Sequence, residues 1–349
     1  MHSPKIQFAF LVFFLALVSA ESYLRCFDRR FASYGERNGS HEYVSMYSQN
    51  ILKSIGDLVY GERRTREKNS RTGKKEFHYA SSFNSINMRD MEHPLPKPFG
   101  EYRIASLGDS FTEGVGAPQD QTWPRLLQKM LPSVNGLRTR VMNCGVNGDD
   151  TVNELQTLRE RVLAYKPDMV IVAVNRSDIT DIATRGGQER IGRPFYRPPG
   201  SPWWEFLFGS SFLVRHFVQG ILGYDWTLKS SAELKAGDAR ALDTIYQTIM
   251  DFAHLSGERG FRLVAVFHPM KHELEKGDWP LDGLIGRLAG EKDILAVNLL
   301  EHYKAECAKS GVPASDIYWP IDLHHNARGY ELFARGVAEA ISKTPGIKN

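Results

Sequence analysis

Mostly apolar runs of five or six residues recur from Tyr102 onward and alternate with segments of helical periodicity. Five of these runs predict β-strands, at residues 102–107, 140–144, 169–174, 263–267 and 294–299. Their apolar residues are continuous rather than alternating, which is typical of strands that are covered on both faces. Strands that alternate with helices favour a parallel sheet between two helical layers. The pattern therefore predicts an α/β domain, a three-layer α/β/α sandwich with a five-stranded parallel sheet.

Helix boundaries in the same region are marked by capping and breaking residues. Thr151-Val-Asn-Glu154 has the form of a capping box, and Lys166-Pro167 ends the helix that follows it. The last helix is expected to begin from an Asn326 cap. In an open parallel sheet, ligands bind beyond the carboxyl ends of the strands, so catalytic residues are expected in the loops that follow the strands.

The first twenty residues form a segment of a different kind. A single lysine, Lys5, precedes the apolar run Ile6–Val18, and Val18-Ser19-Ala20 resembles a signal-peptidase site. Residues 1–20 are therefore interpreted as a signal peptide or as an N-terminal membrane anchor, with membrane association through residues 6–20 in the second case. Both interpretations predict an exported protein, located in the periplasm, outside the cell, or on the outer side of a membrane.

The rest of the chain is divided by its composition. Residues 21–100 have weak periodicity and end in a proline-rich stretch, so we expect an N-terminal extension and linker there. The main domain is expected over residues 101–345. Within it, residues 182–236 lack a strand and are rich in aromatic residues and proline, which indicates an insertion. The part Arg193–Trp204 is interpreted either as a lid over the substrate or as a surface that contacts a membrane.

Charge and cysteine content narrow the range of functions. The chain has 349 residues, of which 42% are hydrophobic and 24% are charged, and its net charge is +3 at pH 7. This near balance gives no reason to expect a nucleic-acid partner. Three cysteines, of which Cys144 lies in a strand-like run, do not support a disulfide framework. Nothing in the composition indicates an oligomeric state.

A candidate nucleophile follows the first predicted strand, in the sequence Leu107-Gly-Asp-Ser110-Phe-Thr-Glu-Gly114. Ser110 lies at a turn between a strand and a helix, on the carboxyl edge of the sheet. Such a turn exposes the hydroxyl group, and backbone N–H groups at the start of a helix can stabilise the oxyanion that forms when a serine attacks an acyl carbon. The same position also suits a serine that only caps the helix.

This motif resembles the first block of the SGNH (GDSL-type) hydrolases, which use Ser, Gly, Asn and His from four separated blocks. Asn143-Cys-Gly-Val-Asn-Gly148 follows the second strand and resembles the second block. The resemblance implies the flavodoxin-like SGNH hydrolase fold, Ser110 as nucleophile, and an oxyanion hole that includes the backbone N–H groups of Ser110 and Gly148. It implies neither a metal nor a cofactor. Upstream, residues 83–90 also resemble a segment that precedes the domain in some membrane-anchored or secreted SGNH proteins.

The last block is similar to the one that supplies the acid and the base in this family. It reads Asp322-Leu-His324-His325-Asn326. In that role a histidine takes the serine proton, and the aspartate orients the ring and stabilises its charged form. The spacing Asp-x-x-His selects His325, whereas Asp-x-His with an asparagine two places later selects His324. We favour His324 with Asp322 as its partner, and keep His325 as the alternative base.

The third block departs from the family pattern of Gly-x-Asn-Asp. After the third strand this chain has Asn175-Arg-Ser177-Asp178. Ser177 therefore replaces the oxyanion asparagine, and Asn175 replaces the glycine. A hydroxyl group reaches less far than a carboxamide, and loss of an oxyanion donor costs about 10² to 10³ in rate. Three alternatives stay open: Ser177 substitutes for the asparagine, Asn175 turns inward, or the site is impaired.

These features together predict an exported serine esterase or deacylase. Its substrate is an acylated small molecule, glycan or lipid, and envelope or extracellular glycans are favoured. A glycan O-acetyltransferase that uses the same Ser-His-Asp site is an alternative, because the acyl-enzyme would be shared. A catalytically weak glycan-binding or assembly protein is an alternative of another class, given the unusual third block and the aromatic insertion.

Overall fold

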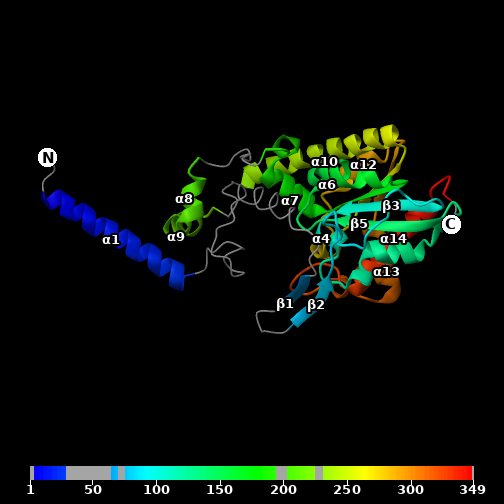
Figure 1. Cartoon of the computed structure of the whole chain (residues 1–349). Helices are drawn as coiled ribbons and strands as arrows, with labels where there is room; N and C mark the ends of the chain where they lie inside the picture. Colours follow the sequence, from blue (N-terminus) through cyan, green and yellow to red (C-terminus); the bar gives the residue numbers. More distant parts are fainter. Residues whose placement is uncertain (1–3, 29–63, 70–74, 194–202, 225–230, 348–349) are drawn as a thin grey trace. The chain divides into compact units, whose positions relative to one another are not determined.

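The computed structural model describes residues 4–28, 64–69, 75–193, 203–224 and 231–347 (Figure 1). By its internal contacts the chain separates into two compact units. The first, here called the N-terminal unit, combines residues 1–54 with residues 184–237. The second, here called the main unit, combines residues 55–183 with residues 238–349.

A six-stranded sheet in the order β4-β5-β3-β6-β7-β8 forms the centre of the main unit (Figure 1). The strands are β3 (Glu101–Gly108), β4 (Ser133–Val134), β5 (Leu137–Gly145), β6 (Met169–Val174), β7 (Arg262–Phe267) and β8 (Ile294–Asn298). Five of them run parallel, whereas β4 pairs antiparallel with β5. The five parallel strands are those that the sequence predicts, so the predicted fold class is confirmed. The sequence analysis missed β4, because two residues are too few to form a recognisable apolar run.

The strand order determines where the site lies. Numbered along the chain, the five parallel strands are arranged 2-1-3-4-5, which is the flavodoxin-like order. The direction of winding therefore reverses between β3 and β6. In such sheets the ligand crevice opens beyond the carboxyl ends of the strands at this reversal. The loop after β3 begins at Asp109, and the loop after β6 begins at Asn175.

Helices cover both faces of the sheet, with α6, α10 and α12 on one face and α13 and α14 on the other (Figure 1). The α-helices of this part of the chain are α4 (Ser110–Glu113), α5 (Trp123–Met130), α6 (Thr151–Thr157), α7 (Arg176–Arg185), α10 (Ser231–Arg259), α11 (Lys271–Lys276), α12 (Asp282–Leu288), α13 (Leu300–Ser310) and α14 (Ala327–Ser342). The strands β3 and β6 have no exposed residue, which agrees with their continuous apolar pattern.

Two helix starts test the predicted caps. Asn326 caps α14, because its side chain accepts hydrogen bonds from the backbone N–H groups of Arg328 and Gly329, so that prediction is confirmed. The capping box predicted to start at Thr151 is wrong by one residue. The cap of α6 is Asp150, whose carboxylate accepts from the N–H groups of Val152 and Asn153. Aspartate accepts as well as threonine at this position, and Asp150 was not predicted as the cap from the sequence.

The segment expected to be an extension and linker contains regular structure. Strand β1 (Arg64–Asn69) pairs antiparallel with β2 (Lys75–Ser81). Both strands belong to the main unit. Phe77 and Tyr79 of β2 are buried and form a small apolar cluster with Val115, against which Trp319 packs. Residues that precede the expected start of the domain therefore pack against loops of the sheet domain.

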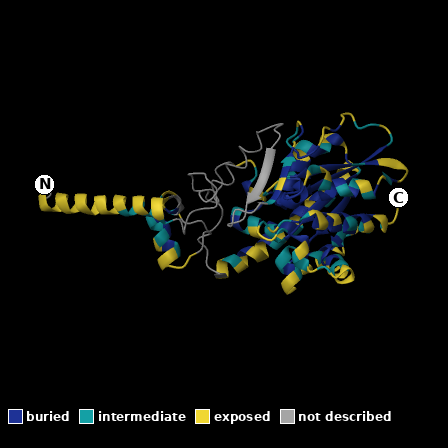
Figure 2. Ribbon diagram, turned by 90° about the horizontal axis from the view of Figure 1, so that it is seen from below, coloured by how far each residue is buried: buried dark blue, intermediate teal, exposed yellow. Residues whose placement is uncertain are grey.

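The N-terminal unit contains one long helix and part of the aromatic insertion. Helix α1 (Pro4–Phe27) has no buried residue, and Figure 2 shows it as exposed along nearly its whole length. It is long and apolar enough to cross a membrane. From the insertion, the unit contains α8 (Glu205–Ser210), α9 (Phe212–Arg215) and a π-helical turn (His216–Ile221). Residues 194–202, which make up most of the expected lid or membrane surface, lie outside the described residues.

Candidate active site

Ser110 is the first residue of α4, directly beyond the carboxyl end of β3. The preceding residue, Asp109, caps the helix, because its Oδ1 accepts the backbone N–H of Phe111 at 2.8 Å. The end of β5 passes very close to this helix. A Cβ atom at Gly145 would lie 2.2 Å from the backbone nitrogen of Glu113, so only glycine permits the approach. The turn at Ser110 is thus fixed by its own cap and by a neighbouring strand.

The structure brings Ser110, His324 and Asp322 together, although 214 positions separate the serine from the histidine. The Nε2 atom of His324 lies 2.7 Å from Ser110 Oγ. The Nδ1 atom of the same ring lies 2.5 Å from Asp322 Oδ1. When Nδ1–H donates to the carboxylate, Nε2 is left with a lone pair that can accept the proton of the serine hydroxyl. This hydrogen-bonded series is the arrangement that activates a serine nucleophile.

The backbone between Asp322 and His324 is neither extended nor helical. Leu323 has a φ angle of 70°, in the left-handed region. This turn directs the side chains on either side of Leu323 toward one another. The left-handed conformation costs a non-glycine residue about 1–2 kcal/mol, so the surrounding loop has to maintain it. Two backbone hydrogen bonds do so, from Trp319 N to His324 O and from Leu323 N to Trp319 O.

Glu76 of β2 also holds this loop. Its carboxylate accepts hydrogen bonds from the backbone N–H groups of Ile321 at 2.7 Å and Asp322 at 3.0 Å. The indole N–H of Trp319, in the same loop, donates to the carbonyl of Gly116 at 3.0 Å. The loop that contains Asp322 and His324 is therefore attached to β2 and to the segment that follows α4. The sequence analysis missed Glu76, because a glutamate beside two lysines carries no recognisable signal.

Arg89 is a second residue that the sequence analysis did not assign to the site. Its side chain is 1% exposed, and its guanidinium donates to the carbonyl groups of Glu113, Gly114 and Ala117 at 3.0, 2.5 and 2.6 Å. These carbonyls lie at and beyond the end of α4, where a helix leaves its acceptors without partners. The guanidinium also lies 4.5 Å from the ring centre of Tyr79. In the sequence, Arg89 was indicated by its place in residues 83–90, which resemble a segment that precedes the domain in some other SGNH proteins.

His325, the alternative base, has a different environment. It is fully buried, and its Nε2 lies 3.4 Å from the hydroxyl of Tyr303 rather than beside Ser110. The rings of Tyr318 and Phe111 lie 4.7 and 5.0 Å from its own. Burial among these rings lowers the pKa of His325 well below its ordinary value. Of the two adjacent histidines, only His324 forms a hydrogen bond with Ser110 in the structure.

The side chains of the third block form hydrogen bonds with one another and with Asp109. The backbone N–H of Ser177 donates to Asn175 Oδ1 at 2.7 Å, which fixes the orientation of the amide. Its Nδ2 then lies 2.9 Å from Asp109 Oδ2 and 3.2 Å from His268 Nε2. Burial lowers the pKa of His268 to about 4, so the ring is neutral and Nε2 can accept. When the neutral ring carries its proton on Nδ1, both amide protons of Asn175 are used inside this network.

Ser177 is engaged in the same way. Its hydroxyl lies 3.0 Å from Asp109 Oδ2 and 2.7 Å from Asn175 Oδ1. A hydroxyl group has one proton, so it donates to one of these oxygens at a time. In this arrangement neither Asn175 nor Ser177 directs a side-chain donor away from the network. The remaining candidates for oxyanion donors are the backbone N–H groups of Ser110 and Gly148.

Gly148 lies in a turn after β5 that is tied to the nucleophile helix. It has a φ angle of 79°, which favours glycine. The N–H of Asn147 donates to Glu113 Oε2 at 2.8 Å, and the N–H of Asp149 donates to the carbonyl of Val146 at 3.0 Å. These hydrogen bonds thus fix the position of the turn relative to α4.

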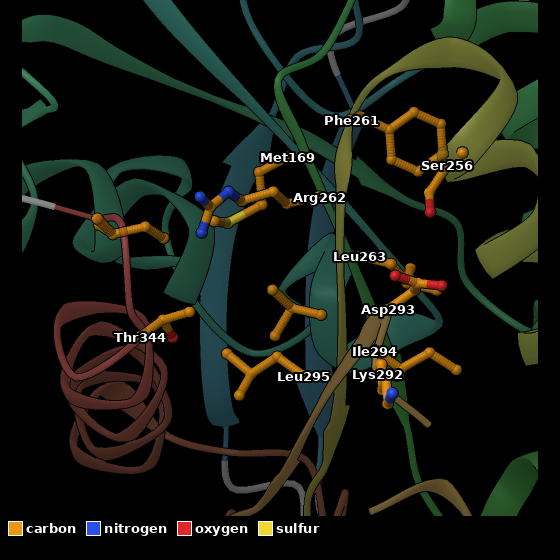
Figure 3. A pocket seen from close by; sticks show the side chains of 13 residues that line it. Met169, Ser256, Phe261, Arg262, Leu263, Lys292, Asp293, Ile294, Leu295 and Thr344 are labelled. Atoms are coloured by element: carbon orange, nitrogen blue, oxygen red, sulfur yellow. The ribbon is translucent and has the colours of Figure 1, made fainter. Parts of the chain in front are cut away.

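Bound groups could be held by clusters of ligating side chains or in a cavity. Within the described ranges, no three His, Cys, Asp or Glu side chains gather closely enough to hold a metal ion. A cavity of about 460 Å³ lies at the amino ends of β6, β7 and β8, where Met169, Arg262 and Ile294 line it (Figure 3). Ser110 follows the carboxyl end of β3, so this cavity lies at the opposite edge of the sheet.

Several known proteins are similar to this chain. An arylesterase of Vibrio mimicus is 32% identical over 76 residues, which make up 22% of this chain and only 38% of that protein. The lipase/acylhydrolase structure from Enterococcus faecalis has a TM-score of 0.42 and 16% identity, covering 69% of this chain and 95% of that one. An acetylxylan esterase structure from Geobacillus stearothermophilus has a TM-score of 0.43 and 17% identity, covering 70% and 95%.

A family model gives the broadest match. The model of the GDSL-like lipase/acylhydrolase family matches residues 106–332. This range is well over half of the chain, and it includes both Ser110 and His324. The resemblance found in the sequence motifs is thereby confirmed, and the chain belongs to the GDSL-like lipase/acylhydrolase family.

Proposed function

We propose that this protein is a serine esterase that cleaves O-acyl esters through a covalent acyl-enzyme. The observation that carries the proposal is the hydrogen-bonded series from Ser110 Oγ through His324 to Asp322. Membership of the GDSL-like lipase/acylhydrolase family supports the same class of reaction. The burial of His325 beside Tyr303 supports His324 as the base.

The mechanism follows from these positions. Ser110 Oγ attacks the acyl carbon while its proton moves to His324 Nε2, and Asp322 stabilises the imidazolium that results. The tetrahedral intermediate collapses when its leaving alcohol takes that proton, which leaves the acyl group on Ser110. His324 then removes a proton from water, and the attack of this water releases the carboxylic acid and restores the serine.

The oxyanion hole is proposed to consist of the backbone N–H groups of Ser110 and Gly148. Asn175 and Ser177 are proposed to act indirectly, because their polar groups bond to Asp109 and to each other. Asp109 in turn caps the helix that begins at Ser110. In this proposal the unusual third block supports the position of the nucleophile and leaves charge stabilisation to the backbone.

The proposed substrates are acylated glycans outside the cytoplasm. The apolar helix at the N-terminus supports export, either as a signal peptide or as an anchor. An acyl-enzyme can also pass its acyl group to a sugar hydroxyl, so an O-acetyltransferase would use the same residues. The two activities differ only in the acceptor of the acyl group.

Acyl release from defined esters tests the proposal. The purified chain is incubated with acetylated xylan, with an acetylated mannan and with a long-chain fatty acyl ester, with and without an unacetylated oligosaccharide. We expect free acetate from the glycans, and none from a Ser110→Ala variant. Acetate that appears only on the added oligosaccharide would identify a transferase. A folded protein that neither releases nor transfers an acyl group would contradict the proposed enzyme and favour a binding role.

A further inference from the structure

The end of α1 is attached to the aromatic insertion. Residues 4–19 of this helix are exposed, whereas Ala20, Glu21 and Leu24 are partly buried and lie on one side of its last turns. The partner is the start of α9 in the same N-terminal unit. Helix α1 thus has a free apolar part and an attached end.

Glu21 is the centre of this attachment. Its carboxylate accepts hydrogen bonds from the backbone N–H groups of Phe212 and Leu213, both at 2.9 Å. It also accepts from the hydroxyl of Ser211 at 2.9 Å and from Arg25 Nε at 2.8 Å. Arg25 donates in addition to the carbonyl of Ser210. A carboxylate that accepts four hydrogen bonds from the protein loses little free energy when lipid replaces the water around it. This contact therefore suits a location close to lipid.

The attached part of the insertion, residues 203–224, is here called the collar. It has a small apolar core of its own, in which Phe208 and Val218 are buried and Trp204 and Val214 pack against them. Other large apolar side chains of the collar point outward. They are Trp203, Leu207, Phe217, Ile221, Leu222 and Tyr224, with exposed fractions of 74, 41, 52, 72, 53 and 44%. These side chains do not pack into the apolar core of the collar. They are therefore available to a partner that favours apolar and aromatic groups.

We infer that the collar rests on the outer surface of a lipid bilayer, with these side chains in the interface between head groups and acyl chains. The inference takes α1 to be retained as a membrane anchor, one of the two alternatives proposed for it. A helix of 24 residues is about 36 Å long, enough for a hydrocarbon core of about 30 Å. Its polar end at Glu21 and Arg25 then lies at the membrane surface. The collar is bonded to that same end, so its apolar groups lie at the level where aromatic residues are enriched in membrane proteins.

Fluorescent probes at single cysteines test this location. The full-length chain carries Cys26→Ser and Cys307→Ser, while the buried Cys144 is kept. One further cysteine is introduced at Ile221, at Val18 of α1, or at the exposed Lys309 of α13, and is labelled with an environment-sensitive dye. The proteins are reconstituted in nanodiscs of phosphatidylcholine and phosphatidylglycerol, with or without lipids that carry a spin label near the head group. We expect several-fold stronger quenching at positions 18 and 221 than at position 309.

The outcomes separate the anchor from the collar. Quenching at position 18 but not at position 221 would overturn the location of the collar and leave the anchor in place. Quenching at neither position would overturn both. A Glu21→Ala variant should lose quenching at position 221 and keep it at position 18, whereas the exposed Ser22→Ala, one residue away, should change neither. None of these readings depends on esterase activity, so a failure here is distinct from a failure of the proposed function.

Discussion

Two loops near Ser110 differ in what their polar side chains bond to. The loop that contains Asp322 and His324 is held from outside, by Glu76 and by the backbone around Trp319, and its two polar side chains form a series directed at the nucleophile. In the loop after β6, Asn175 and Ser177 bond to each other and to Asp109. In the proposed function the first loop supplies the acid and the base, whereas the second supports Asp109, which caps α4.

This difference explains why one motif matches its family and the other does not. A general base has to be within hydrogen-bond reach of the serine, so the residue type and its position are both demanding. An oxyanion can be stabilised by backbone N–H groups, which any sequence supplies. The third block can therefore differ from the family pattern, because its Asn175 and Ser177 hydrogen-bond to Asp109 instead.

The largest expected effect separates the two histidines of the first loop. His324→Ala removes the proposed base, so we expect kcat/KM for p-nitrophenyl acetate to fall by about 10²- to 10⁴-fold. His325→Phe keeps an aromatic ring in the pocket formed by Tyr318 and Tyr303, and we expect only a small loss. A steady-state assay of both variants, with circular dichroism to verify folding, makes the comparison. A greater loss in His325→Phe than in His324→Ala would reverse the proposed roles.

The pH dependence of the unfolding free energy tests the hydrogen-bond network around the loop after β6, in which His268 contacts Asn175. The folded-state pKa of His268 is about 4, below the value of 6.5 for a free histidine, because the ring is buried. Between these values the unfolded chain binds more protons, so this histidine contributes stability that is present above pH 6.5 and is lost as the pH falls toward 4. The wild type should therefore lose up to about 3 kcal/mol more unfolding free energy than His268→Gln between pH 7 and pH 4. Urea denaturation at both pH values measures this, and equal losses would contradict a buried neutral ring.

Removal of the contacts between β2 and the loop of Asp322 and His324 should have an intermediate effect on kcat. Glu76→Ala removes both acceptors for the backbone N–H groups of Ile321 and Asp322, so the loop and His324 shift. A displacement of about 1 Å in a catalytic group can cost 10²-fold, and we expect a 10- to 10²-fold loss in kcat. The exposed Glu301→Ala on α13 is the matched control and should retain full activity. A Glu76→Ala enzyme with unchanged kcat would show that the loop keeps its position without β2.

The smallest effect is expected for Ser177. If its hydroxyl only supports Asp109, Ser177→Ala should lower kcat by less than about 10-fold, because an oxyanion donor is worth about 10² to 10³. The partly buried Ser315→Ala serves as the control for a serine outside the site. A loss of 10² or more in Ser177→Ala, with an unchanged melting temperature, would assign the hydroxyl to the oxyanion hole.

Much of the fold could be predicted from the sequence, because strands covered on both faces leave unbroken apolar runs such as Met169–Val174. The short strand β4 and the hairpin of β1 and β2 could not, since neither has that pattern. In the site, Ser110, Asp322 and His324 belong to motifs. Glu76 and Leu323 do not, because one acts through backbone N–H groups and the other through a left-handed turn, and both depend on contacts that form only after folding.

The proposed function requires Ser110 to be a nucleophile that His324 and Asp322 activate. Reaction of the full-length chain with a fluorophosphonate probe, followed by mass spectrometry of the labelled peptide, tests it most directly. We expect a single modification at Ser110, lost in His324→Ala and Asp322→Ala and retained in His325→Phe. A folded wild-type protein that stays unlabelled at Ser110, or labelling that survives in His324→Ala at the wild-type rate, would contradict it.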